Sequence, residues 1–142
     1  MHVQVAIMVK APLEKTYTAY TDFESWPKWS RQATEVKVIR REGNFVTIRS
    51  MSGSPERTRF STTSLLLTPP EKVESTSEKR LTRTRRTVTF EGTSDGTKVT
   101  AVLDVEVNGL WRAIFTPKGM EEAESSAQNG LKSFAEYVES LP

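Results

Sequence analysis

The chain of 142 residues has no cysteine and a single histidine, His2, next to its first residue. Without thiols it has no disulfide framework and no thiolate that could act as a nucleophile or as a metal ligand. One imidazole near a chain end does not make a histidine metal cluster or a serine–histidine relay. We therefore expect no metal site and no cofactor, and we assign no catalytic residue.

Long apolar runs are also missing. No stretch approaches the roughly 20 apolar residues that a membrane helix needs. The first ten residues, MHVQVAIMVK, lack the basic start and the small-residue cleavage site of a signal peptide. We expect a soluble, cytoplasmic protein without a membrane span, and the length predicts a single domain over residues 1–142.

Charge of one sign is not in large excess, because the net charge is +2 with 27% charged residues. The basic run KRLTRTRR at residues 79–86 lacks the interleaved aromatic residues of a nucleic-acid surface. We expect no nucleic-acid partner. Apolar residues are scarce too: counted with Gly they reach about 41%, against about 45–50% in a typical domain. The core is therefore expected to be either modest or partly hollow.

The pattern of apolar residues predicts strands over most of the chain. Residues 2–10 alternate between apolar and polar side chains, which is typical of a half-buried strand. LEKTYTAYTDF, residues 13–23, has helical spacing instead. Further strands are predicted over 34–51 as a hairpin turning at Gly43-Asn44, over 57–67, twice within 71–91 with a turn near 79–82, and over 98–108 after an Asp95-Gly96 turn.

The last part of the chain predicts one long amphipathic helix from about Lys118. Its apolar stripe consists of Met120, Ala123, Ala127, Leu131, Phe134, Val138 and Leu141. A twisted sheet has an apolar face that must be covered, and this helix is the only long element available to cover it. The sequence therefore predicts an α+β fold in which a curved antiparallel sheet of about seven strands wraps around the C-terminal helix. Short helical segments are expected between the first two strands.

This element order and two motifs resemble the START/SRPBCC superfamily, which has the helix-grip or Bet v-type fold. The first motif lies in APLEKTYTAYTDFESWPKWS at residues 11–30, with Tyr17, Tyr20, Asp22-Phe23 and Trp26-Pro27-x-Trp29. The second, VTFEG…GTKVTAVLDVEV, is similar to the last two strands of the polyketide cyclase/dehydrase and coenzyme-Q-binding branch. The resemblance implies a hydrophobic small molecule held in a cavity between the sheet and the long helix.

Trp26 and Trp29 are predicted to close one end of the sheet, either as part of the core or as a wall of the cavity. A buried indole N–H needs a polar partner, and Asp22 or Ser30 could supply it locally. Residues 109–120, GLWRAIFTPKGM, hold Trp111, Phe115 and Met120 just before or in the long helix. This segment is either a packed start of the helix or a lid over the cavity mouth.

Hydroxyl groups are expected on the inner face of the middle strands. If Val88 and Phe90 point inward, period two places Thr84 and Arg86 on the same face. A dry core would fill such positions with large apolar residues, so hydroxyls there suggest a hydrated or ligand-holding cavity, or strands that are half solvated. The residues predicted to contact the ligand are Trp26, Trp29, Phe60, Thr62, Ser64, Arg86, Val88, Phe90, Leu103, Trp111, Phe115, Met120 and Phe134.

Arg86 is the charged member of this set. An arginine on an apolar face is costly without a partner, and it could bind a carboxylate or phosphate on an otherwise apolar ligand. The alternative is that Arg86 lies at a strand end or is turned outward by a bulge. Arg83 and Arg85 are expected on the outer face, where Glu74 and Glu78 could pair with them.

Three functions are compatible with this sequence. The first is binding or carriage of a hydrophobic small molecule, such as a lipid, an isoprenoid or a polyketide-like compound, by a monomer or weak dimer. The second is a polyketide cyclase or dehydratase that uses the same cavity. The third is a protein-interaction module, which would combine a filled core with an exposed apolar patch.

Overall fold

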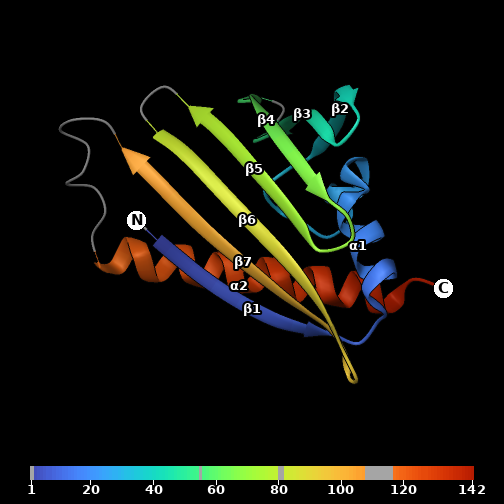
Figure 1. Cartoon of the computed structure of the whole chain (residues 1–142). Coiled ribbons are helices and arrows are strands. Elements are labelled where there is room, and N and C mark those ends of the chain that lie inside the picture. Colours follow the sequence, from blue (N-terminus) through green and yellow to red (C-terminus); the bar gives the residue numbers. More distant parts are fainter. Residues whose placement is uncertain (1, 55, 80–81, 108–116) are drawn as a thin grey trace.

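Seven strands form one antiparallel sheet in the order β1-β7-β6-β5-β4-β3-β2 (Figure 1). The structure is a computed structural model that describes residues 2–54, 56–79, 82–107 and 117–142. The strands are β1 (His2–Val9), β2 (Glu35–Glu42), β3 (Phe45–Ser52), β4 (Arg59–Thr68), β5 (Lys72–Lys79), β6 (Thr82–Thr93) and β7 (Gly96–Val107). The helices are α1 (Leu13–Thr21), the short 3-10 helix η1 (Phe23–Lys28) and α2 (Pro117–Ser140). The predicted helix-grip architecture is confirmed.

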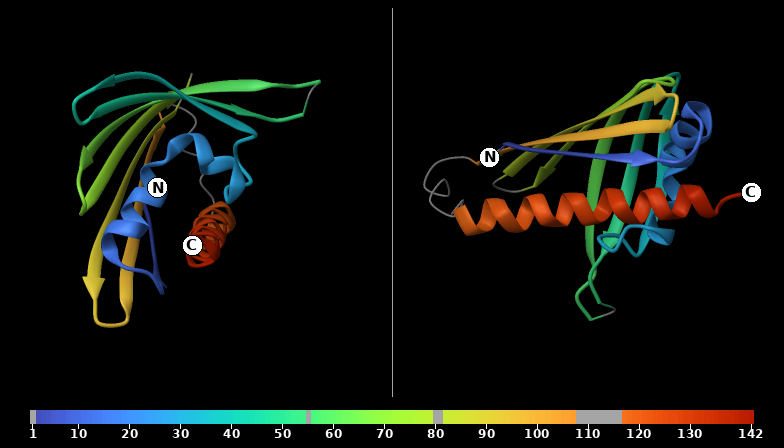
Figure 2. Two further views of the ribbon diagram at one scale, coloured as in Figure 1. Left: turned by 90° about the vertical axis from the view of Figure 1, so that its right-hand side faces the viewer. Right: turned by 90° about the horizontal axis from the view of Figure 1, so that it is seen from below.

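The C-terminal helix α2 runs beneath the curved sheet, as the two views of Figure 2 show. It packs mainly against β1, and its C-terminal end lies beside α1. Its N-terminal end lies on the side where β6 begins and β7 ends (Figure 1). None of the described helices is long and apolar enough to cross a membrane.

Two glycines make the tight turns of the sheet possible. Gly43 has φ of 57° between β2 and β3, and Gly96 has φ of 139° at the start of β7. The turns lie at Gly43-Asn44 and Asp95-Gly96 as predicted, and of these four residues only the two glycines take left-handed geometry, because no described residue other than glycine has positive φ. A side chain at Gly96 would place its Cβ 2.1 Å from the carbonyl oxygen of Val9. The strand start therefore requires glycine for space as well as for conformation.

The predicted turn near residues 79–82 falls between β5 and β6, whose last described pair is Lys79 with Thr82. On the outer face of this hairpin, Arg83 Nε lies 3.5 Å from Glu78 Oε1, which confirms the ion pair predicted for Glu78. Glu74 pairs instead with Lys72, whose Nζ lies 3.8 Å from Glu74 Oε2. Arg83 and Arg85 are both exposed. The inner face of the sheet consequently carries the opposite set of residues, which includes Arg86.

Candidate functional site

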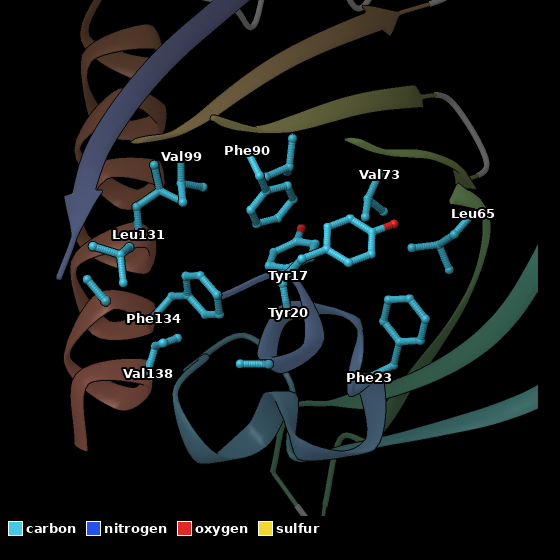
Figure 3. Close-up of a cluster of buried hydrophobic side chains, with 14 of the residues drawn as sticks. Tyr17, Tyr20, Phe23, Leu65, Val73, Phe90, Val99, Leu131, Phe134 and Val138 are labelled. Atoms are coloured by element: carbon cyan, nitrogen blue, oxygen red, sulfur yellow. The ribbon is translucent and has the colours of Figure 1, made fainter. Parts of the chain in front are cut away.

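The concave face of the sheet divides into an apolar half and a polar half. In the apolar half the inward side chains are nearly all buried, and they include Val46, Ile48, Leu65, Leu67, Val73, Val88, Phe90 and Val99. The C-terminal half of α2 covers them with Leu131, Phe134 and Val138. Figure 3 shows these side chains meeting the aromatic rings of α1. This half is the hydrophobic core.

Aromatic rings from four elements, α1, η1, β6 and α2, close one end of that core. The Tyr20 ring lies edge-on to Phe90 and to Phe134, with centroids 5.4 Å apart in each pair. Trp29 lies 5.0 Å from Phe134, and Trp26 lies 6.0 Å from Trp29. Edge-on packing of this kind contributes stability beyond that of burying apolar area, because the positive edge of one ring attracts the negative face of the other. Trp26 and Trp29 thus pack against the core cluster at the end of the sheet.

The indole partners differ from those predicted. Trp26 Nε1 donates a hydrogen bond of 2.7 Å to the backbone oxygen of Tyr20. Neither Asp22 nor Ser30 accepts from it, and Asp22 instead accepts a 2.6 Å hydrogen bond from Ser25 Oγ. Trp29 Nε1 is buried and has no hydrogen-bond partner in the described part of the chain. The acceptor for Trp26 is therefore the backbone of α1 and not a nearby side chain.

The polar half of the concave face continues along the same strands. In register, Ser77 on β5 pairs with Thr63 on β4 and with Thr84 on β6. Ser75 pairs with Arg86, and Arg86 pairs with Leu103 on β7. These inward side chains are half-buried, whereas their neighbours in the apolar half are buried. Antiparallel pairing therefore brings four hydroxyl groups and one guanidinium together on one face.

Arg86 reaches the hydroxyl of Tyr20 on α1. Tyr20 is 4% exposed, and burial raises the pKa of its phenol. The charge of Arg86 and a hydrogen bond from its side chain oppose that rise in pKa. The contact confirms that Arg86 points inward, and it places a positive charge at the border between the two halves. Tyr20, which the sequence shows as part of the motif at residues 11–30, is thus the polar neighbour of Arg86.

The inward orientation predicted for Phe60, Thr62 and Ser64 is wrong. Phe60 is 63% exposed, and Thr62 and Ser64 are exposed as well. The inward side chains of β4 are those of the opposite parity, with Leu65 and Leu67 buried. A one-residue change of register moves every side chain of a strand to the other face, and three consecutive leucines fit either choice. Phe60 instead packs on the outer face beneath the guanidinium of Arg49, 5.5 Å from the ring centroid.

The structure does bring together most of the other predicted residues. Val88, Phe90 and Phe134 are buried in the core, and Leu103 is half-buried beside Arg86. Met120 does not join them, since it is 40% exposed on α2. Trp111 and Phe115 lie outside the described residues.

The N-terminal half of α2 presents small side chains to the sheet. Ala123 and Ala127 are half-buried and pack against the core cluster, while the residues around them are exposed. Large apolar residues on the helix stripe begin only at Leu131. The helix therefore presents bulky groups to the core from its C-terminal half and small groups from its N-terminal half.

Two depressions lie elsewhere on the described surface, both beside α1. One depression lies between α1 and the ends of β5 and β6, lined by residues such as Leu13, Lys72 and Phe90. Another lies between α1 and the end of α2, beside Tyr137 and Leu141. Within the described ranges, no three His, Asp or Glu residues are grouped so that they could hold a metal ion.

Comparison with known proteins agrees with this architecture. Residues 1–139 match a family model described as "Polyketide cyclase / dehydrase and lipid transport". A search of curated protein sequences found no match.

Several solved structures are similar. TTHA0849 from Thermus thermophilus superposes with a TM-score of 0.81 at 18% identity, covering 97% of both chains. A START superfamily protein from Mycobacterium smegmatis has a TM-score of 0.80 at 17% identity, covering 99% of both chains. The Zhui aromatase/cyclase from Streptomyces has a TM-score of 0.80 at 14% identity, covering 98% of this chain and 93% of that one. At such identities the likeness establishes the fold.

Proposed function

Because the chain belongs to the polyketide cyclase/dehydrase and lipid transport family, we propose that it binds and carries a hydrophobic small molecule. The ligand would lie on the concave face of the sheet, between its polar half and the N-terminal half of α2. Lipids, isoprenoids and polyketide-like compounds have the required apolar surface. Apolar walls would supply most of the affinity, and the hydroxyl groups would set the orientation.

One observation carries this proposal. The inward side chains of the polar half stay half-buried, although they belong to the same strands as the buried core. Towards its N-terminus, α2 presents Ala123 and Ala127 to the core cluster, where its C-terminal half presents Leu131 and Phe134. A protein that only needed a stable core would place large apolar side chains on both surfaces. Small and polar side chains at these positions therefore favour a face that binds a ligand.

The first experiment is native mass spectrometry of freshly purified protein, followed by solvent extraction and identification of any bound molecule. It also reports whether the protein is a monomer or weak dimer, as we expect for a cytoplasmic carrier. Binding of N-phenyl-1-naphthylamine, an uncharged apolar fluorophore, provides a second readout that does not depend on a co-purified molecule. Saturable fluorescence enhancement at about one site per chain is expected.

A matched pair of variants locates the binding site. Thr84→Trp adds bulk to the inner face of β6 and should abolish fluorophore binding while the far-UV circular dichroism stays unchanged. Arg83→Trp adds the same side chain to the exposed outer face, one residue away, and should bind as the original protein does. Absence of both a bound molecule and fluorophore binding in the original protein would refute the proposal. Equal binding by the two variants would show that the fluorophore does not bind on the inner face of β6.

A cyclase or dehydratase acting in the same place is the second candidate. The similarity to an aromatase/cyclase and the inward Arg86–Tyr20 contact favour it, because a guanidinium can stabilise an enolate oxygen. An unchanged mass of a bound polyketide-like compound after incubation would favour the carrier. A loss of water from that compound, dependent on Arg86, would favour the enzyme.

A further inference from the structure

Arg86 lacks a carboxylate partner within the described residues. The ion pairs there join other residues, such as Arg83 with Glu78 and His2 with Asp104 on the outer face. Arg86 is half-buried on the inner face, where Ser75 and Leu103 flank it in register. A partly desolvated cation without a counter-ion lowers the stability of a fold unless another function requires it. Arg86 at this position is therefore better explained by binding of an anion than by a contribution to stability.

The Tyr20 hydroxyl is arranged to assist Arg86. The Tyr20 phenol lies close enough to Arg86 for the guanidinium charge to oppose the rise in its pKa, and the phenol O–H is a hydrogen-bond donor. A guanidinium and a phenol O–H thus sit together at the border of the apolar core. Both donate hydrogen bonds, and an oxygen anion can accept from both at once.

The charge of the surroundings indicates which anion fits. The inward residues next to Arg86 are Ser75, Ser77, Thr84 and Leu103, none of which is ionised. One positive charge balances one negative charge, and the planar guanidinium matches the two oxygens of a carboxylate. A phosphate monoester carries a charge of about −1.5 to −2 at neutral pH, which a single arginine would leave unbalanced.

We propose that Arg86 and the Tyr20 hydroxyl bind the carboxylate of a long-chain acid whose apolar tail lies along the concave face. This inference rests on the proposed function and names the class of ligand. The tail would contact Leu103, which pairs with Arg86 in register on that face and is only half-buried. The ligand is thus an amphipathic monocarboxylic acid, not a neutral lipid.

Displacement of N-phenyl-1-naphthylamine by three twelve-carbon competitors tests this. Dodecanoate should displace the fluorophore from the original protein at a concentration about tenfold or more below that of dodecanol, because hydrogen bonds to charged groups are the strong ones. Dodecyl phosphate should be weaker than dodecanoate. Arg86→Met should lose the preference for the acid while still binding dodecanol. Tyr20→Phe keeps the ring and should reduce the preference by a smaller factor.

The control is Arg85→Met, which removes the same charge from the exposed outer face of β6 and should keep the full preference. Far-UV circular dichroism checks the fold of each variant, and Arg86→Gln serves as a second uncharged variant should Arg86→Met not fold. Equal displacement by dodecanoate and dodecanol from the original protein would overturn the inference and leave the proposed function standing. So would an unchanged preference in the folded Arg86 variant, or tighter binding of dodecyl phosphate. Failure of the original protein to bind the fluorophore would instead refute the proposed function.

Discussion

Replacing Phe134 by alanine should destabilise the protein by about 3–5 kcal/mol, the range for removing a buried aromatic ring. Phe134 is 0% exposed, and its ring lies edge-on to Tyr20 at 5.4 Å and to Trp29 at 5.0 Å. Each aromatic pair contributes about 0.5–1.5 kcal/mol beyond the burial of its area. The neighbouring rings belong to α1 and to the segment at the end of η1, so they cannot collapse together into the space left behind. The upper part of the range is therefore expected.

Urea unfolding followed by tryptophan fluorescence and by far-UV circular dichroism measures this loss. The control is Met120→Ala on the same helix, which should change the free energy of unfolding by less than about 0.5 kcal/mol because Met120 is an exposed surface residue. A loss below about 1 kcal/mol for Phe134→Ala would refute the assignment of the core to the C-terminal half of α2. Equal losses for the two variants would refute the division of the helix into two halves.

Three further predictions concern the turn, a buried hydroxyl and the phenol. Gly96→Ala should lower the free energy of unfolding by more than Gly43→Ala does, for which a loss of about 1–2 kcal/mol is expected. The reason is that a Cβ at Gly96 meets a backbone oxygen at 2.1 Å, whereas Gly43 has open space around it. Thermal unfolding compares the two variants. Thr97→Val should lower the free energy of unfolding, measured in urea, by about 1–3 kcal/mol. The fully buried Thr97 hydroxyl donates a 2.8 Å hydrogen bond to the backbone oxygen of Ala11, and valine cannot make it. Burial raises the pKa of Tyr20 above 10.0, so the folded state holds the phenol proton more tightly than the unfolded state does. Stability should therefore be intact below pH 10.0 and fall as the pH rises beyond it, and Tyr20→Phe should fall less steeply in urea titrations across that range. Intact stability of Gly96→Ala, no loss in Thr97→Val, or parallel pH profiles for Tyr20→Phe would each contradict the corresponding contact.

The sequence by itself determined the elements and their order. Period-two alternation predicted β1 and β7, and the apolar stripe predicted α2, because both depend on neighbours within one element. These local signals were enough to predict the helix-grip fold. They did not settle which face of residues 71–91 points inward, and the structure shows that Val73, Val88 and Phe90 do.

Only the tertiary structure decided which residues meet across the concave face. The run Leu65-Leu66-Leu67 fits either orientation of β4, and pairing with β3 and β5 selected the one that turns Phe60 outward. The contact between Arg86 and Tyr20 joins β6 to α1, and no local pattern can encode a meeting between elements far apart in the chain. Register and helix placement are set by the packing of the whole core, so the candidate site emerged only from the assembled fold.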